Sequence, residues 1–389
     1  MSFKQAPQLV IRITPWTMRI GISALVNAII IIGERPYLLV KYKNKSYVLV
    51  EQNRRFVLMI ANMKRYNKLF EKVVDIENIK DAIKNSSKGK LKKKDVKLVL
   101  NNIDLYVEKI RNMLINGNYN TSKYFIFNKK SGYKIRKIYE LPYYPDRIIH
   151  HCIVQVLKPI WMNLFVRDTY ATIPKRGIHD CVKRIKDDLM DINRTKFCLK
   201  MDIHHFYPSI DHDCLKQILR RKIKDKKLLC LIDGIIESAD GIPIGNYLSQ
   251  WLANIYLAYF DHYCKEILKC KYYYRYCDDI VILGDNKEKL HYICMEIRKY
   301  MVNRLNVSIK DNYQIFPIDK RGIDFLGYRF FHGYTLVRKR IVKDMKKAKS
   351  IQSKMSYYGW LCHADSYRLI NKYYGNKEIQ RFCKRGVSA

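Results

Sequence analysis

Long apolar runs, paired cysteines and acidic residues are all scarce in this chain of 389 residues. The nearest candidate for a membrane span, residues 20–32, is shorter than the roughly 18 apolar residues that a bilayer requires, and no small-residue cleavage site of a signal peptide follows it. The 11 cysteines are scattered, odd in number and without a Cys-x-x-Cys pair, which argues against a disulfide framework and a structural zinc site. We therefore expect a cytoplasmic protein without a membrane partner, in which residues 20–32 form a strand or belong to an extension of unknown role.

The shortage of acidic residues leaves a large positive charge. The chain has 36 Asp and Glu residues against 74 Lys and Arg residues, a formal net charge of +38. Such an excess predicts a polyanionic partner, because each neutralised phosphate releases counterions. Aromatic residues make up 13% of the chain, and aromatic rings stack on bases, so nucleic acid is a better candidate than anionic lipid. The length allows two or three subdomains.

Two adjacent acids interrupt a stretch that otherwise reads as strands. Asp278 and Asp279 follow Tyr276-Cys277 and lie between the apolar runs 272–274 and 280–283. Burying two acids is costly unless their charge is compensated, whereas a tight hairpin would expose both at its tip. Paired carboxylates at one point are typical ligands of Mg²⁺. Taken alone, an Asp-Asp pair is more often a solvated turn.

A third acid and a glycine-rich turn give this pair its context. Asp202 ends another apolar strand that begins at Phe197, and residues 241–250 form a turn with Gly and Pro that leads into a helical pattern. This ordered set resembles the palm of a reverse transcriptase, with motif A at Asp202, motif B at residues 241–250 and motif C at residues 276–279. The resemblance implies an α+β fold: a right-hand polymerase with fingers, a palm (an antiparallel sheet backed by helices) and a short helical thumb.

The resemblance also divides the chain into segments. Residues 1–62 do not resemble the family and form an N-terminal extension, residues 63–196 the N-terminal helices and fingers, residues 197–330 the palm with motifs A to E, and residues 331–389 the thumb. Within these segments we expect helices over 64–115 interrupted by the basic run 86–94, strands at 124–128 and 134–140, a helix from residue 146, and a helix over 342–358. The basic run fits a solvated loop and a contact with template RNA equally well.

The family resemblance implies DNA synthesis, in which a primer 3′-oxygen attacks the α-phosphorus of a nucleotide with the help of two metal ions. The implied cofactor is Mg²⁺, two ions, with Mn²⁺ as an alternative. Asp202 and Asp278 are the expected ligands of both ions, the backbone carbonyl of Ile203 assists, and Asp279 has a smaller or indirect role. In motif D, Lys310 is a candidate for the lysine that protonates pyrophosphate in the family, because Asn312 or Tyr313 stands at the usual position.

Other residues are assigned by the same resemblance. Tyr207 is expected under the sugar, where it excludes a 2′-hydroxyl, although a core aromatic residue is the alternative. The remaining nucleotide-binding candidates are Lys134 and Arg136 on the triphosphate, with a generic basic strand as the alternative, and Ile244, Gly245 and Gln250 in motif B. The expected primer grip comprises Phe325, Leu326 and Gly327.

Motif B departs from the common Gln-Gly-x-x-x-Ser-Pro pattern. Residues 244–250 read Ile-Gly-Asn-Tyr-Leu-Ser-Gln, a form similar to the reverse transcriptases of diversity-generating retroelements, a group II intron-like bacterial lineage. That resemblance implies error-prone copying of a template RNA, mainly at adenines, by an enzyme that handles dNTPs, cDNA and the RNA–DNA hybrid. It also implies a small basic oligomeric accessory protein as a partner.

Two kinds of alternative remain open at the level of sequence. A retron-like, defence-associated or group II intron-like reverse transcriptase is the first, although the retron-type Val-Thr-Gly and a maturase extension are absent. A catalytically dead palm that only binds RNA is the second, and the three intact acids argue against it.

Overall fold

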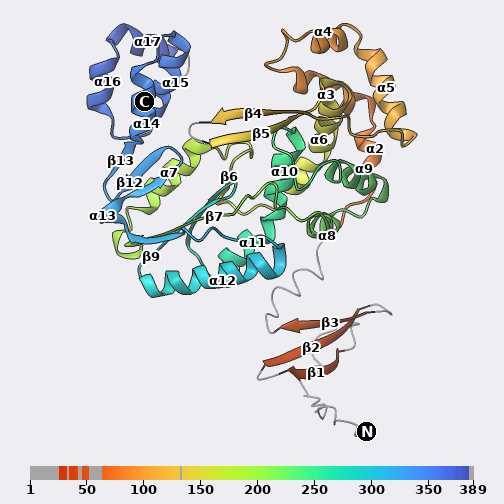
Figure 1. Cartoon of the computed structure of the whole chain (residues 1–389), viewed down its shortest axis with the longest axis horizontal. Coiled ribbons are helices and arrows are strands. Elements are labelled where there is room, and N and C mark those ends of the chain that lie inside the picture. The colour runs from red at the N-terminus through yellow and green to blue at the C-terminus, as the bar shows by residue number, and fades with distance from the viewer. Residues whose placement is uncertain (1–25, 33–34, 43–45, 52–63, 132–133, 385–389) are drawn as a thin grey trace. The chain divides into compact units, whose positions relative to one another are not determined.

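The computed structural model describes residues 26–32, 35–42, 46–51, 64–131 and 134–384 (Figure 1). Its contacts divide the chain into two compact units, Met1–Arg65 and Tyr66–Ala389. In the first unit, β1 (Val26–Ile32), β2 (Arg35–Tyr42) and β3 (Ser46–Glu51) form an antiparallel sheet in chain order. The strand expected within residues 20–32 is present over Val26–Ile32, and residues 20–25 lie outside the described ranges.

The second unit begins with short helices. They are α2 (Phe70–Val73), α3 (Ile76–Ser87), α4 (Lys94–Asn101) and α5 (Ile103–Ile115). Asp75 caps α3, since its Oδ1 accepts 3.1 Å hydrogen bonds from the amides of Glu77 and Asn78 and so satisfies two of the free N–H groups of the first turn. The expected interruption by basic residues is confirmed, although it spans only residues 88–93.

A two-stranded hairpin and a long buried helix follow. β4 (Phe125–Ser131) pairs antiparallel with β5 (Lys134–Glu140), which confirms both expected strands, the first shifted by up to three residues. After η2 (Tyr143–Arg147) the chain enters α6 (Ile148–Met162). This helix is apolar over most of its surface and buried accordingly, as expected for a helix that packs on several neighbours.

A five-stranded sheet forms the centre of the unit (Figure 1). Its strands, in the order β10-β7-β9-β8-β6, are β10 (Gln314–Pro317), β7 (Phe197–Asp202), β9 (Asp279–Gly284), β8 (Tyr272–Tyr276) and β6 (Thr169–Tyr170). Four strands pair antiparallel, as expected of a palm, but β6 pairs parallel with β8. Parallel pairing is possible at this edge because about a hundred residues, which include β7 and several helices, separate β6 from β8 and allow the chain to return in the same direction.

The alternation of side chains along the strands places two different layers on the sheet. Tyr272, Tyr274, Val281 and Leu283 belong to a core shared with α7 (Ile178–Asp188) and the C-terminal part of the chain. Tyr273 and Arg275 point to the other face, where Asp261 of α11 (Ala258–His262) binds both. On the way between β7 and β8 the chain also forms α8 (His212–Lys222), α9 (Lys226–Ile236) and α10 (Tyr247–Tyr256), and α12 (Lys287–Leu305) then contacts β7, β9 and β10.

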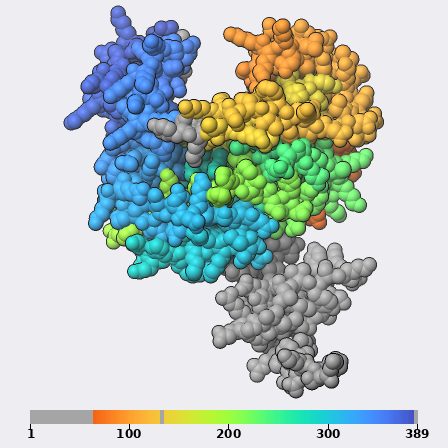
Figure 2. Space-filling view, in the orientation of Figure 1, coloured from red at the N-terminus to blue at the C-terminus, as the bar shows by residue number. Residues whose placement is uncertain are grey.

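The C-terminal part contains a small sheet and four helices. After the short α13 (Ile318–Arg321), β11 (Ile323–Phe325), β12 (Tyr328–Phe331) and β13 (Tyr334–Val337) form an antiparallel sheet, and α14 (Lys339–Lys346), α15 (Ile351–Leu361), α16 (Tyr367–Tyr373) and α17 (Asn376–Lys384) follow. Within this unit, Figure 2 shows a hollow between these helices, in blue, and α4 and α5, in orange, above the hairpin β4–β5, in yellow. The division into fingers, palm and thumb at residues 196 and 330 stays a prediction.

The single helix expected over residues 342–358 is wrong. The structure breaks it between α14 and α15, where Ser350 acts as an N-cap and its Oγ accepts a 3.2 Å hydrogen bond from the Ser353 amide. A serine at such a position competes with continuation of the helix because it satisfies the free N–H groups of a new start. Within the described ranges, no helix combines the length and apolarity needed to cross a membrane.

Candidate active site

The three predicted acids meet at one end of the central sheet. Tyr276 and Asp279 are paired across β8 and β9, so Cys277 and Asp278 form a two-residue turn. The expected hairpin is confirmed, but only Asp278 lies in its turn, Asp279 begins β9, and both acids are half-buried rather than exposed. Asp202, the last residue of β7, lies directly opposite Asp279 of β9. Directly opposite residues have Cβ atoms only about 5 Å apart, so the register alone brings two of the acids together.

Asp278 shows the electrostatic consequence of this gathering. Burial raises the pKa of its carboxyl to about 6, and the negative charges of Asp202 and Asp279 add to the effect. Like charges that share a site disfavour ionisation of one of them. A divalent cation would relieve this repulsion, so the donor set suits a hard ion such as Mg²⁺.

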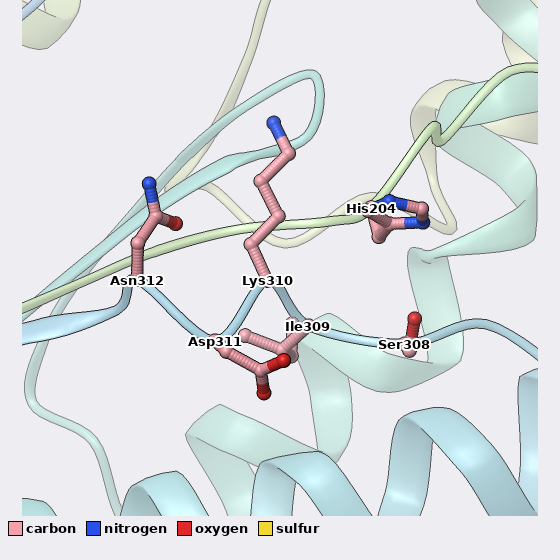
Figure 3. Close-up of a pocket in the computed structure, with 6 residues that line it drawn as sticks. All are labelled: His204, Ser308, Ile309, Lys310, Asp311 and Asn312. Carbon is pink, nitrogen blue, oxygen red and sulfur yellow. The ribbon is translucent and has the colours of Figure 1, made fainter.

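Lys310 supplies a positive charge at the same place. Its Nζ donates a hydrogen bond to Oδ2 of Asp202, and its backbone amide donates to the Asp202 carbonyl at 2.9 Å. In Figure 3 the Lys310 side chain points away from the neighbouring Asp311, beside a surface cavity of about 450 Å³. With Lys310 bound to Asp202, the three carboxylates are not grouped closely enough to hold an ion as they stand, and no other three His, Cys, Asp or Glu side chains of the described residues are so grouped. Binding of Mg²⁺ would therefore require the Asp202 carboxylate to exchange Lys310 for the ion.

The backbone of Ile203 has a defined direction. Ile203 is buried and forms an antiparallel bridge with Ile309. The hydrogen bonds from His204 to Ser308, at 2.8 Å, and from Lys310 to Asp202 flank this bridge. In such a non-hydrogen-bonded pair the carbonyl of each residue points away from its partner. The Ile203 carbonyl therefore faces the side of β9 and motif C.

Tyr207 lies against the motif C turn. Burial raises the pKa of its hydroxyl, the neighbouring Cys277 and Asp278 raise it further, and the positive charge of Arg136 on β5 opposes them. The carbonyl of Tyr207 accepts a 2.8 Å hydrogen bond from Ile242 of motif B. Tyr207 of motif A thus contacts motif B through its backbone and motif C through its ring, within reach of the charge of an exposed arginine of the β4–β5 hairpin. Lys134 begins the same strand, β5.

Motif B is joined to the hairpin through its backbone. The amide of Tyr139 on β5 donates a 2.8 Å hydrogen bond to the carbonyl of Ile244. Gly245 has φ +133°, and a Cβ atom placed there would lie 2.4 Å from the Tyr139 carbonyl oxygen. Gln250 lies further along, on α10, where its Oε1 accepts a 2.9 Å hydrogen bond from Thr172.

The expected primer-grip residues occupy the turn between β11 and β12. Leu326 and Gly327 have φ +49° and +85°, and the Gly327 carbonyl accepts a 2.8 Å hydrogen bond from Arg338. Phe325 is only 1% exposed and packs in the core. Gly327 is buried too, with Trp360 and Ile341 against it, so Leu326 is the one residue of the three that stays partly exposed.

Sequence reasoning missed two residues beneath the acids, Arg275 and Asp261. They form a fully buried ion pair. In the sequence, Arg275 stands out as a single charged residue within the strand Tyr272–Tyr276, and Asp261 as a single acid within the apolar region of α10 and α11. Nothing in the sequence indicates that these two residues contact each other.

The family to which the chain belongs follows from its similarity to known proteins. Residues 128–330, which are 203 of the 389 residues, match the family model "Reverse transcriptase (RNA-dependent DNA polymerase)". The chain belongs to the reverse transcriptase family. The expected enzyme class, RNA-directed DNA polymerase, and the expected right-hand polymerase fold are thereby confirmed.

Relatives of this reverse transcriptase include proteins of group II introns. Protein YkfC of Escherichia coli (strain K12) is 24% identical over 277 residues, 59% of this chain and 71% of that protein. Group II intron-encoded protein LtrA of Lactococcus lactis subsp. cremoris is 28% identical over 155 residues, 37% of this chain, which spans only 25% of that protein. A structure of telomerase from Candida albicans in complex with a TWJ fragment of telomeric RNA has a TM-score of 0.45 and 11% identity over 72% of this chain and 63% of that chain.

Proposed function

We propose that this reverse transcriptase copies a template RNA into error-prone cDNA for a diversity-generating retroelement. Its partners are the template RNA, dNTPs, the cDNA in its RNA–DNA hybrid and a small basic oligomeric accessory protein, and its place of action is the cytoplasm. The observation that carries the polymerase assignment is the meeting of Asp202, Asp278 and Asp279 beside Tyr207. The subtype rests on Ile244 at the position where most of the family has Gln.

The residues divide the chemistry among them. Asp202 and Asp278, with Asp279 and the Ile203 carbonyl, would hold two Mg²⁺ ions, which align the attacking and leaving oxygens and neutralise their charge. Tyr207 forms the wall against a 2′-hydroxyl of the incoming nucleotide. Arg136, exposed on the hairpin β4–β5, and Lys134 bind the triphosphate. A guanidinium group is suited to that task because it makes two parallel hydrogen bonds to phosphate oxygens.

The template RNA passes along the hairpin side of Gly245. A cavity of about 630 Å³ there is lined by basic side chains, including Lys90, Lys123 and Arg147, and by the rings of Phe125 and Phe127. Basic groups neutralise the phosphates and rings stack on unpaired bases. This arrangement suits a single strand of RNA on its way to the templating position, and it makes the basic loop between α3 and α4 a template contact.

Ile244 explains the low fidelity. Its side chain cannot replace the hydrogen bonds of a Gln amide, while its carbonyl remains tied to Tyr139. One lost hydrogen bond to a correctly paired nucleotide changes relative stabilities by about 0.5–1.5 kcal/mol, a factor of a few up to about ten in selectivity. Apolar contact alone thus steadies the templating pair.

The test is primer extension on an RNA template that contains all four bases, followed by sequencing of the cDNA. We expect wild-type errors to concentrate at template adenines and Ile244→Gln to reduce them by about three- to tenfold. Ile244→Val is the matched control, because it stays apolar and should keep the wild-type spectrum. Equal errors at all four bases in all three proteins would refute the diversity-generating assignment.

A group II intron-like reverse transcriptase is the second candidate, favoured by the 28% identity to LtrA. It predicts accurate copying, with errors low and spread over all four bases. The same sequencing experiment therefore separates the two candidates, and a complete lack of extension would favour an RNA-binding palm without activity.

A further inference from the structure

A buried ion pair lies beneath the motif C turn. Arg275, the fourth residue of β8, donates from Nε to Oδ1 of Asp261 at 2.6 Å and from Nη2 to Oδ2 at 2.5 Å. Both side chains are 0% exposed. The two parallel hydrogen bonds fix the plane of the guanidinium group, because carboxylate and guanidinium match in geometry.

Asp261 is itself held in place from both sides. Tyr273 donates its hydroxyl to Oδ1 at 2.6 Å, and Thr169 of β6 donates to Oδ2 at 2.7 Å. The carboxylate thus accepts four hydrogen bonds, which is about its full capacity. Neither Asp261 nor the guanidinium edge bound to it can rotate without breaking several of these bonds.

The remaining nitrogen of Arg275 points at the active site. Nη1 donates to the carbonyl oxygen of Cys277 at 2.9 Å and to Oδ1 of Asn254 at 3.1 Å. Cys277 has φ +55°, a left-handed conformation that is strained for a residue other than Gly. The carbonyl that Arg275 holds belongs to the peptide bond that leads directly into Asp278.

The same cluster reaches motif B. Asn254 lies on α10 and donates from Nδ2 to the carbonyl of Ala171 at 3.0 Å, and the adjacent Thr172 binds Gln250 on the same helix. Ala171 and Thr172 both have positive φ, +77° and +61°. One buried cation thereby connects the motif C turn to a second strained segment that contacts the motif B helix.

Holding the fold together does not require this arrangement. Well-packed apolar residues often replace a buried ion pair without loss of stability, and the contacts with Asp261 already satisfy the charge of Arg275. The hydrogen bond from Nη1 to the Cys277 carbonyl is not needed to neutralise Arg275. It is directed instead at the turn that carries Asp278.

We propose that Arg275, fixed by Asp261, is a positioning residue that holds the motif C turn in its left-handed conformation and so aims Asp278 at Asp202. The inference rests on the proposed catalytic role of Asp278. It requires that loss of the Nη1 bond lowers the rate of the chemical step more than it lowers substrate binding.

The test compares two variants of the full chain. Arg275→Lys keeps a positive charge beside Asp261 but lacks the planar group that reaches the Cys277 carbonyl. We expect kcat for primer extension to fall by about tenfold to a hundredfold, while KM for dNTP and Kd for the template–primer stay within about twofold. Tyr274→Phe is the matched control, because it removes a part-buried 2.6 Å hydrogen bond to Asp188 from the same strand. Tyr274 points to the opposite face, so the change should lower Tm and leave kcat within about twofold.

A second variant keeps the test decisive if Arg275→Lys does not fold. Arg275→Gln combined with Asp261→Asn buries no net charge and also lacks the guanidinium group, so the same loss of kcat is expected. Three results would overturn the inference. The first is wild-type kcat in either folded Arg275 variant, and the second is failure of both variants to fold. The third is a fall in kcat of Tyr274→Phe in proportion to its fall in Tm, because loss of stability alone would then explain the loss of activity. Asp278→Asn is measured alongside: if it extends primers, the catalytic assignment of Asp278 fails, whereas an inactive Asp278→Asn with an active Arg275→Lys refutes the positioning role alone.

Discussion

The backbone amide of Tyr139 donates a 2.8 Å hydrogen bond to the carbonyl of Ile244, which joins the β4–β5 hairpin to motif B. The contact is so close at the next residue that a Cβ atom on Gly245 would lie 2.4 Å from the Tyr139 carbonyl oxygen. A nucleotide bound between the hairpin and the acids depends on the relative position of these two segments. The backbone, rather than a side chain, sets that position.

Gly245→Ala should therefore separate the hairpin from motif B. The added methyl group collides with backbone, and φ +133° is strained for any residue with a Cβ. We expect KM for dNTP to rise at least about tenfold, with a loss of stability of about 1–3 kcal/mol. Gly234→Ala is the control: no atom lies within 4 Å of its added Cβ in α9, so it should stabilise the helix by up to about 1 kcal/mol. Unchanged nucleotide binding in Gly245→Ala would contradict the argument.

The three acids give a prediction on activity. Asp202→Asn or Asp278→Asn should abolish Mg²⁺-dependent primer extension, because each removes a charged oxygen from the proposed metal site. Binding of template RNA should stay close to wild type, since it depends on basic and aromatic residues elsewhere. Filter binding and primer extension on the same preparations measure both. Full activity in either variant would rule out the two-metal assignment.

The raised pKa of Asp278 predicts a gain in stability on its removal. Its folded pKa of about 6 lies above the ordinary value of about 3.9, so ionisation destabilises the folded state as the pH rises between these values. In EDTA, Asp278→Asn should thus raise Tm by a few degrees at pH 7.5, and the difference should vanish near pH 4. The shift corresponds to at most about 3 kcal/mol. Asp311→Asn, at a side chain that is 92% exposed, should change Tm at neither pH.

Tyr207 gives a prediction on sugar selectivity. Tyr207→Ala or Tyr207→Val should admit ribonucleotides, because the wall against the 2′-oxygen is removed. Tyr207→Phe keeps the ring and should keep the discrimination, which makes it the matched control. Competition between dNTP and rNTP in single-nucleotide extension measures the ratio. If discrimination is the same in all four proteins, another residue forms the gate.

The local structure was largely predictable where the signal lies within one segment. The strand Lys134–Glu140 was placed with the correct ends, and the hairpin that carries Asp278 followed from apolar runs on either side of two acids. Such patterns work because alternation and turn residues act over a few neighbours. The break between α14 and α15 was missed because the basic residues around it are good helix formers, and only the cap by Ser350 reveals the new start.

The contacts between distant segments were not predictable in the same way. Asp261 and Arg275 are paired because α11 packs on the face of β8 that carries Arg275, and a single sequence does not state which elements pack together. The sequence indicates Lys310 only as a substitute for the motif D lysine, whereas its contact with Asp202 depends on the bridge between Ile203 and Ile309. In both cases the contact is determined by the packing of elements that are far apart in the sequence.

The boundary between the two units gives the last prediction. Tyr66 is tied to the second unit by backbone hydrogen bonds, from its own amide to Lys222 at 2.8 Å and from Lys224 to its carbonyl at 2.7 Å. Asp225 next to them accepts bonds from the amides of Leu69 and Phe70 at 2.7 and 2.8 Å. A protein that begins at Met63 keeps all these contacts and should retain polymerase activity and a Tm close to that of the full chain.

A shorter protein that begins at residue 68 is the matched control. It loses both bonds of Tyr66, each worth about 0.5–1.5 kcal/mol, so its Tm should fall by several degrees while the version from Met63 does not change. Thermal unfolding and primer extension of the two truncated proteins beside the full chain provide the measurement. If the protein from Met63 fails to fold or to extend primers, residues 1–62 are an integral part of the enzyme, because the bonds of Tyr66 to Lys222 and Lys224 are still present in it.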